Sequence, residues 1–244
     1  PKHVKYIGKN CFIDSNINTL ELPLNSDALI IDRNSFSLKI KNILMPSNII
    51  LKSGSCNFAS VNNIKIIETE GKNIQIYDDK FIITKSNINI NEYDVLIYAS
   101  RDIKDVVIPP FIKIIGSYAF SGSLIKSITI PSTIKEIGQY AFKNCRNLMN
   151  VKFDPNSQIQ ILEEGIFQST SIESISIPES VRDIENNAFY NCNKLRNIEL
   201  TPDSQLQIIN KCAFYMTALN TIIIPPHLTE IYDETFLGCL RNIE

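Results

Sequence analysis

The stretch IKSITIPSTIKEIGQYAFKNC, residues 125–145, contains every marker of a unit that recurs along this chain. Its first part reads hydrophobic-x-x-hydrophobic-x-hydrophobic and ends at Pro131. Its second part reads Ile-Gly-x-x-Ala-Phe, and the unit closes on Asn-Cys. The phenylalanine recurs at alternating spacings of 22 and 25 residues, at Phe120, Phe142, Phe167, Phe189, Phe214 and Phe236. Such a period predicts one supersecondary unit stacked many times along one axis.

The first part of the unit predicts a short β-strand. Its last hydrophobic positions alternate, which is the period of a strand that buries one side. Proline has no N–H to give to a strand ladder, so we expect it to end each strand and turn the chain. Copies of this part occupy residues 17–22, 40–45, 103–108, 125–130, 148–153, 172–177, 195–200 and 219–224.

The second part predicts a packed layer of rings. The motif Ile-Gly-x-x-Ala-Phe ends at Phe120 and at Phe142, and looser copies occupy residues 184–189, 209–214 and 231–236. A small alanine beside a large phenylalanine at fixed positions suggests that each ring rests on the ring of the neighbouring coil. The predicted fold is a β-rich solenoid. It has one parallel strand per coil and short extended or turn segments on the convex side.

These motifs resemble the BspA-like leucine-rich repeats, whose units read roughly L-x-x-I-x-I-P-x-x-V-x-x-I-G-x-x-A-F-x-x-C. The match is close over 103–244 and looser over 1–70, and it lacks the asparagine ladder of the commoner leucine-rich class. The resemblance implies a β-rich, right-handed leucine-rich-repeat superhelix. It also implies a surface-exposed protein that mediates adhesion to host proteins or cells.

Residues 71–102 depart from the unit. They contain short β segments at 74–77, 81–84 and 95–98, separated by polar turns such as Asp78-Asp79. A degenerate or inserted coil that keeps the stack continuous is one interpretation. A functional insertion or a subdomain break is the other.

We expect residues 1–244 to form a single solenoid, with looser repeats over 1–70 and regular repeats of 22–25 residues over 103–244. The chain opens on Pro1, and residues 240–243 begin a further unit. Because a solenoid normally has polar caps at its ends, we expect this chain to be part of a longer array.

Composition argues against several classes of function. A net charge of −2 predicts no nucleic-acid partner, and the longest apolar runs are strand-sized, so we expect no membrane insertion. Cys145, Cys192 and Cys239 lie two coils apart, about 10 Å at the usual strand spacing and beyond disulfide reach. All six cysteines are therefore expected to be free, buried thiols. The only two histidines, His3 and His227, are isolated, so we expect no metal, no cofactor and no catalytic site.

Two columns of residues alternate with the buried strand positions. The first is uniformly small and polar and suggests a structural ladder: Thr19, Asn42, Asn63, Asp105, Ser127, Asn150, Ser174, Asn197 and Thr221. The second changes in charge and polarity from coil to coil: Glu21, Leu44, Lys65, Val107, Thr129, Lys152, Ser176, Glu199 and Ile223. Repeat proteins recognise partners through variable positions on a constant frame. The candidate partner-contact face is therefore Lys65, Thr129, Lys152, Ser176, Glu199 and Ile223, with neutral drift as the competing interpretation.

The predicted function is a non-enzymatic protein-binding module. By the family resemblance it is a cell-surface or secreted adhesin, whose partner is a host surface or matrix protein. An intracellular scaffold or signalling adaptor that uses the same face is the alternative. The sequence leaves the oligomeric state open.

Overall fold

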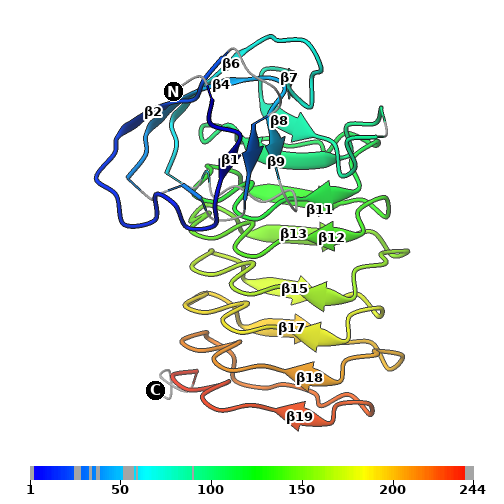
Figure 1. The fold of residues 1–244 in the computed structure, drawn as a ribbon. Helices are drawn as coiled ribbons and strands as arrows, with labels where there is room; N and C mark the ends of the chain where they lie inside the picture. The colour runs from blue at the N-terminus through cyan, green and yellow to red at the C-terminus, as the bar shows by residue number, and fades with distance from the viewer. Residues whose placement is uncertain are drawn as a thin grey trace.

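The computed structural model describes residues 3–24, 29–32, 35–36, 39–51, 58, 60–89 and 91–239, and within them the fold is a stack of β coils without helices. Figure 1 shows the C-terminal coils as successive layers from β11 to β19. The first row of strands carries the predicted strand motif. It consists of β2 Thr19–Glu21, β4 Asn42–Pro46, β6 Asn63–Ile67, β11 Ser127–Ile130, β13 Asn150–Phe153, β15 Ser174–Ser176 and β17 Asn197–Glu199. In this row β2 pairs with β4, β4 with β6, β11 with β13 and β15 with β17, all in parallel, as predicted.

A second row of two-residue strands accompanies the first. It consists of β1 Tyr6–Ile7, β3 Ile30–Ile31, β5 Ile50–Leu51, β10 Ile114–Ile115, β12 Glu136–Ile137, β14 Ile161–Leu162, β16 Asp183–Ile184, β18 Ile208–Ile209 and β19 Glu230–Ile231. In the regular coils these strands end at the position that isoleucine holds in the Ile-Gly motif, which is Leu162 in β14. They pair in parallel as β10–β12 and as β14–β16–β18–β19. The short extended segments that the sequence predicts are thus joined by a ladder of their own.

Two predicted strands are absent. Residues 103–108 and 219–224 carry the strand motif but are not assigned to strands. Within the described part of the chain, each segment has a first-row strand on one side only. The single backbone contact from Lys126 N–H to Lys104 O, for example, is long at 3.4 Å. Without a ladder of hydrogen bonds to the next coil, the strand motif by itself does not produce a strand.

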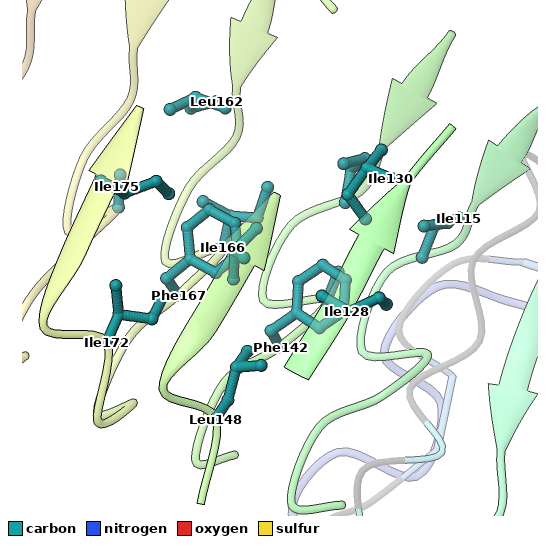
Figure 2. Packing of buried hydrophobic residues seen from close by; sticks show 14 of the residues in the cluster. Ile115, Ile128, Ile130, Phe142, Leu148, Leu162, Ile166, Phe167, Ile172 and Ile175 are labelled. Atoms are coloured by element: carbon teal, nitrogen blue, oxygen red, sulfur yellow. The ribbon is translucent and has the colours of Figure 1, made fainter. Parts of the chain in front are cut away.

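The phenylalanines form one continuous stack through the regular coils. Ring centroids from Phe120 to Phe236 lie 5.2–5.6 Å apart, with interplanar angles of 5–26°. Figure 2 shows Phe142 and Phe167 with isoleucine and leucine side chains around them. Five of the six rings are fully buried. The predicted ring layer is confirmed, and stacking adds to the free energy gained by burying the rings.

Each stacked phenylalanine lies between two left-handed residues, a feature that the sequence analysis did not predict. The residue two before the ring has positive φ in every regular coil: Tyr118, Tyr140, Gly165, Asn187, Cys212 and Glu234. The residue two after it does as well: Gly122, Asn144, Ser169, Asn191, Met216 and Gly238. Six of these twelve positions hold glycine or asparagine, the residues that tolerate this conformation best, and the other six do not. The paired turns aim the ring into the stack despite that local strain.

The irregular segment forms an antiparallel hairpin with a third strand. β7 (Ile74–Tyr77) pairs with β8 (Phe81–Thr84), and β8 pairs with β9 (Val95–Ala99), as the three predicted β segments require. β9 then pairs in parallel with β10, so the hairpin extends the row of short strands.

The hairpin separates two hydrophobic clusters. Phe81, Ile83 and Leu96 belong to the C-terminal cluster, whereas Ile82 and Val95 belong to the N-terminal cluster. Every residue of β8 and β9 is buried. A strand covered on both faces needs a continuous apolar run instead of alternation, which explains the sequence FIIT and VLIYA.

Arg101 links the parts of the chain on either side of the hairpin. Its guanidinium donates hydrogen bonds to Phe58 O at 2.8 Å and to Ala119 O at 3.1 Å, and lies 4.5 Å from the centroid of the Tyr98 ring. Burial lowers the pKa of Arg101, with a partly opposing effect of Tyr98. The planar guanidinium supplies two divergent donors and a face for stacking, which an ammonium group lacks.

We expect Arg101→Lys to lower the free energy of unfolding by about 2 kcal/mol, because one buried carbonyl loses its partner and the stacking on Tyr98 is lost. Chemical denaturation measures this. Arg146→Lys, at an exposed turn, is the matched control and is expected to have little effect. Equal stability of the two variants would show that Arg101 does not link the two parts.

We expect Gly165→Ala to destabilise the fold by about 3 kcal/mol and Gly122→Ala by about 1 kcal/mol. Both glycines have positive φ, but a Cβ at Gly165 would lie 2.2 Å from Cε1 of Tyr140, whereas a Cβ at Gly122 meets nothing within 4 Å. The difference in destabilisation between the two variants therefore measures the effect of the collision with Tyr140, apart from the backbone strain that both share. Thermal and urea unfolding measure it, and equal losses would contradict the close contact with Tyr140.

Candidate functional site

The exposed side of the C-terminal strands forms a continuous surface. Thr129 lies opposite Lys152 in the β11–β13 pair, and Ser176 lies opposite Glu199 in the β15–β17 pair. β13 in turn contacts β15, so the four residues follow one another across four coils. We call these four residues the C-terminal face.

Strand alternation positions the C-terminal face. All four of its side chains are exposed, while Ile128, Val151 and Ile175 between them are buried. The buried set fixes the register, because a shift of one residue would exchange the two sides. The backbone frame is therefore set by the core, and the residue type at each exposed position is free to vary.

The two charges of the C-terminal face have no ionic partner within the described residues. The ion pairs there join Lys72 to Glu68, Lys80 to Asp78, Lys113 to Glu92 and Lys211 to Glu234. Lys152 and Glu199 take part in none of them. Both charges are thus available to a molecule that approaches the face.

The structure does not bring all six predicted contact residues together. Lys65 is exposed, but it lies on β6 in the separate sheet β2-β4-β6, which is divided from β11 by the hairpin. Ile223 is 79% exposed, in the segment that forms no strand. Leu44, expected to be exposed, is half-buried, whereas Val107 is 85% exposed. The predicted column is therefore divided where residues 71–102 interrupt the repeat.

The predicted polar ladder exists at one end of the stack. Asn42 donates to Thr19 at 3.3 Å, and Asn63 donates to Asn42 at 2.8 Å. In the described C-terminal coils, Ser127, Asn150, Ser174 and Asn197 make no side-chain hydrogen bond to one another. Serine is too short to reach the next coil, so alternation of serine with asparagine breaks the ladder there.

A shallow hollow of about 340 Å³ adjoins the C-terminal face. Lys152 and Ser176 lie on one side of it, and Asp154 and Glu179 contribute carboxylates from the turns that follow the strands. The hydroxyl of Thr201 also lines it and has no hydrogen-bond partner. Sequence analysis did not find this hollow, because it depends on how successive turns are offset.

The cysteines are free, but they are not simply small hydrophobes. Cys145, Cys192 and Cys239 are buried, and each donates a hydrogen bond to a phenylalanine carbonyl of the preceding coil, at 2.9–3.0 Å. Each thiol also lies 3.1–3.4 Å from a serine or threonine hydroxyl, on Ser123, Thr170 and Thr217. The column thus alternates hydroxyl and thiol groups. Cys11 is exposed, contrary to the prediction, and Cys56 lies outside the described residues.

Burial raises the pKa of the Cys145 and Cys192 thiols to about 11. The thiol therefore keeps the proton that it donates to the phenylalanine carbonyl. Cys212 is buried differently, with its thiol 3.2 Å from Glu234.

The described residues contain no group of three or more His, Cys, Asp or Glu that could hold a metal ion. Among the described residues there is no helix with the length and apolar character that a membrane span needs. Chemically, the site offers hydrogen-bonding groups, isolated charges and an extended surface.

Comparisons with known proteins agree with the fold. A model of the BspA type leucine rich repeat region matches residues 1–89 and 113–243, in six copies. No curated protein sequence matches the chain.

Three solved bacterial structures share the architecture. A leucine-rich repeat protein of Eubacterium ventriosum has a TM-score of 0.63 at 16% identity, over 100% of this chain and 76% of that one. A leucine rich cell surface protein of Faecalibacterium prausnitzii has a TM-score of 0.61 at 22% identity, over 95% of this chain and 52% of that one. A leucine-rich repeat protein of Bacteroides ovatus has a TM-score of 0.53 at 23% identity, over 87% of this chain and 53% of that one. The chain thus spans about half the length of the last two, and these identities support the fold alone.

We expect iodoacetamide at pH 8 to alkylate Cys11 in the folded protein at least about 100-fold faster than Cys145 or Cys192, because the thiolate is the reactive form. A pKa of about 11 leaves roughly one thiol in a thousand ionised at that pH, and burial restricts access further. Mass spectrometry of peptides after timed labelling measures the rates. In denaturant the three rates should become similar. Equal rates in the folded state would contradict the buried hydrogen bonds.

Proposed function

The chain belongs to the BspA-type leucine-rich repeat family, and we propose that it is a non-enzymatic protein-binding module that uses the C-terminal face. The observation that carries the proposal is the exposure of Lys152 and Glu199 on a continuous surface where neither has an ionic partner. A protein partner would supply the opposite charges, while the rigid strand rows would limit the loss of conformational entropy on binding.

The arrangement of the face supports a protein partner over a small ligand. Only Lys152 and Ser176 of the four exposed residues line the hollow, whereas the four together extend across four coils. Extended surfaces of this kind suit partners that contact many coils at once. Ser176 adds a hydroxyl group between the two charges and Thr129 adds one beyond Lys152, so hydroxyl groups and charges alternate along the face.

Placement at the cell surface is part of the proposal. It rests on the family and on the Faecalibacterium prausnitzii structure, which is described as that of a cell surface protein. An adhesin that binds a host surface or matrix protein is the function that these features support best. Protease shaving of intact cells tests the location, and protection of the chain until lysis would contradict it.

An intracellular scaffold that uses the same face is the second candidate. The free thiols favour it, in particular the exposed thiol of Cys11, because reducing compartments preserve such groups. Detection of the chain in the soluble fraction of lysed cells, bound to a cytosolic protein, would support this candidate over the adhesin.

We expect the double variant Lys152→Glu/Glu199→Lys to weaken partner binding by at least about tenfold without lowering the melting temperature, because it reverses both unpaired charges and keeps the net charge. The partner is first isolated by pull-down from host matrix and cytosolic extracts. Binding of the purified partner is then measured by biolayer interferometry.

The matched control is Lys194→Glu/Glu136→Lys, which reverses two exposed charges away from the C-terminal face. It should bind as the unaltered chain does. If the first double variant retains full affinity, the C-terminal face is not the binding surface.

A further inference from the structure

A cleft of about 480 Å³ opens beside β6, where the N-terminal strand row stops. Residues of β2, β4 and β6 line one side, ending with Asn63, Ile64 and Lys65 on the last strand, and Ile76 and Lys80 of the hairpin line another. Figure 1 shows β6 and β7 near each other at the N-terminal end of the stack. The volume falls in the range of about 300–1,000 Å³ that is usual for binding sites.

The edge of β6 at this cleft carries unused backbone groups. Asn63 donates its N–H to Lys41 O, and Ile67 O accepts the N–H of Ser47, so both turn toward β4. Alternate residues of a strand turn these groups to opposite edges, so Ile64 and Ile66 direct theirs away from β4. Within the described part of the chain, no backbone hydrogen bond engages those groups, and β6 pairs with β4 alone.

The open edge results from a missing strand. The strand motifs that begin at Val61 and Ile103 are 42 residues apart, nearly two units, and the hairpin occupies the sequence between them. The hairpin fills the core and extends the row of short strands, but it adds nothing to the row of β2, β4 and β6. Ile64 and Ile66 consequently pack on the N-terminal cluster and are only half-buried.

We propose that this cleft binds an extended peptide segment of a protein partner, which adds to β6 as a parallel fourth strand. The proposal rests on the proposed protein-binding function and names a second, separate contact. Strand addition would satisfy the N–H and C=O of Ile64 and Ile66, and main-chain bonding of this kind gives affinity to peptide recognition.

The residues of β6 define the side chains that suit such a peptide. Beside Asn63 a polar residue would continue the bonded ladder Thr19–Asn42–Asn63. Beside Ile64 and Ile66, apolar residues would cover the half-buried side chains. Beside Lys65, which forms no ion pair within the described residues, an acidic residue would pair with the ammonium group. The expected motif is polar–apolar–acidic–apolar.

Within the sheet of β2, β4 and β6, Lys65 is the charge nearest to an added strand, because Glu21 lies two strands from the open edge, on β2. On the hairpin side of the cleft, the charge of Lys80 is balanced by Asp78 at 2.6 Å, and Asp79 also lines the cleft.

The chain itself supplies a probe with this motif. A fluorescein-labelled synthetic peptide of residues 195–202, LRNIELTP, carries Asn-Ile-Glu-Leu in the required order. Fluorescence anisotropy with the whole chain is expected to show saturable binding. Lys65→Glu should weaken it by about tenfold, and a peptide with lysine in place of its glutamate should bind the Lys65→Glu variant better than the original peptide does. Lys194→Glu is the matched control.

Two methylated peptides test the strand geometry without altering the protein. In a parallel addition the peptide glutamate turns its N–H toward Ile64 O, while the preceding isoleucine turns its N–H away. N-methylation at the glutamate should abolish binding, whereas N-methylation at the isoleucine should leave most of it.

The absence of binding up to about 1 mM, equal effects of the two methylations, or an unchanged affinity of Lys65→Glu would each overturn the proposal. Those outcomes would leave the test of Lys152 and Glu199 unaffected. If reversing Lys152 and Glu199 left partner binding unchanged, the peptide experiment would still test the cleft.

Discussion

The phenylalanine stack is the interaction on which the rest of the structure depends. Its rings repeat at 5.2–5.6 Å, slightly more than the spacing of hydrogen-bonded strands of about 4.8 Å. Left-handed residues lie on both sides of each ring. The same turns direct the phenylalanine carbonyls toward the thiols of Cys145, Cys192 and Cys239 in the next coil. Ring stacking, backbone turns and buried hydrogen bonds therefore act as one arrangement, repeated in successive coils.

The hairpin of β7, β8 and β9 shows what happens when the repeat is interrupted and the core is not. Its strands are apolar on both sides and close two hydrophobic clusters at once, so burial continues through the interruption. The ladder of β2, β4 and β6 does not continue, because no strand follows β6 in that row. At this place the core packing continues but the strand pairing stops, and the cleft beside β6 is the result.

Much of this arrangement could be predicted from the sequence because the markers recur in order. The strand row, the ring layer and the three β segments of residues 71–102 were predicted, and the structure confirms them. The prediction of strands at 103–108 and 219–224 was wrong, because a motif cannot show whether the ladder hydrogen bonds to the neighbouring coil form. The exposure of Lys152 and Glu199 followed from alternation. The separation of Lys65 from the C-terminal face did not, because it depends on how the hairpin folds.

The sequence by itself determined the family, the stacked architecture and the set of side chains that face the core, because each of these depends on residue type at a fixed period. The tertiary structure decided which exposed residues share a surface, which thiols are buried donors and where a strand edge is left open. These features depend on contacts between coils, where a residue's neighbours lie 22 or more positions away in the chain. The repeat period alone specifies the structure of one coil. The packing of one coil on the next specifies the exposed surface, the buried thiols and the open strand edge.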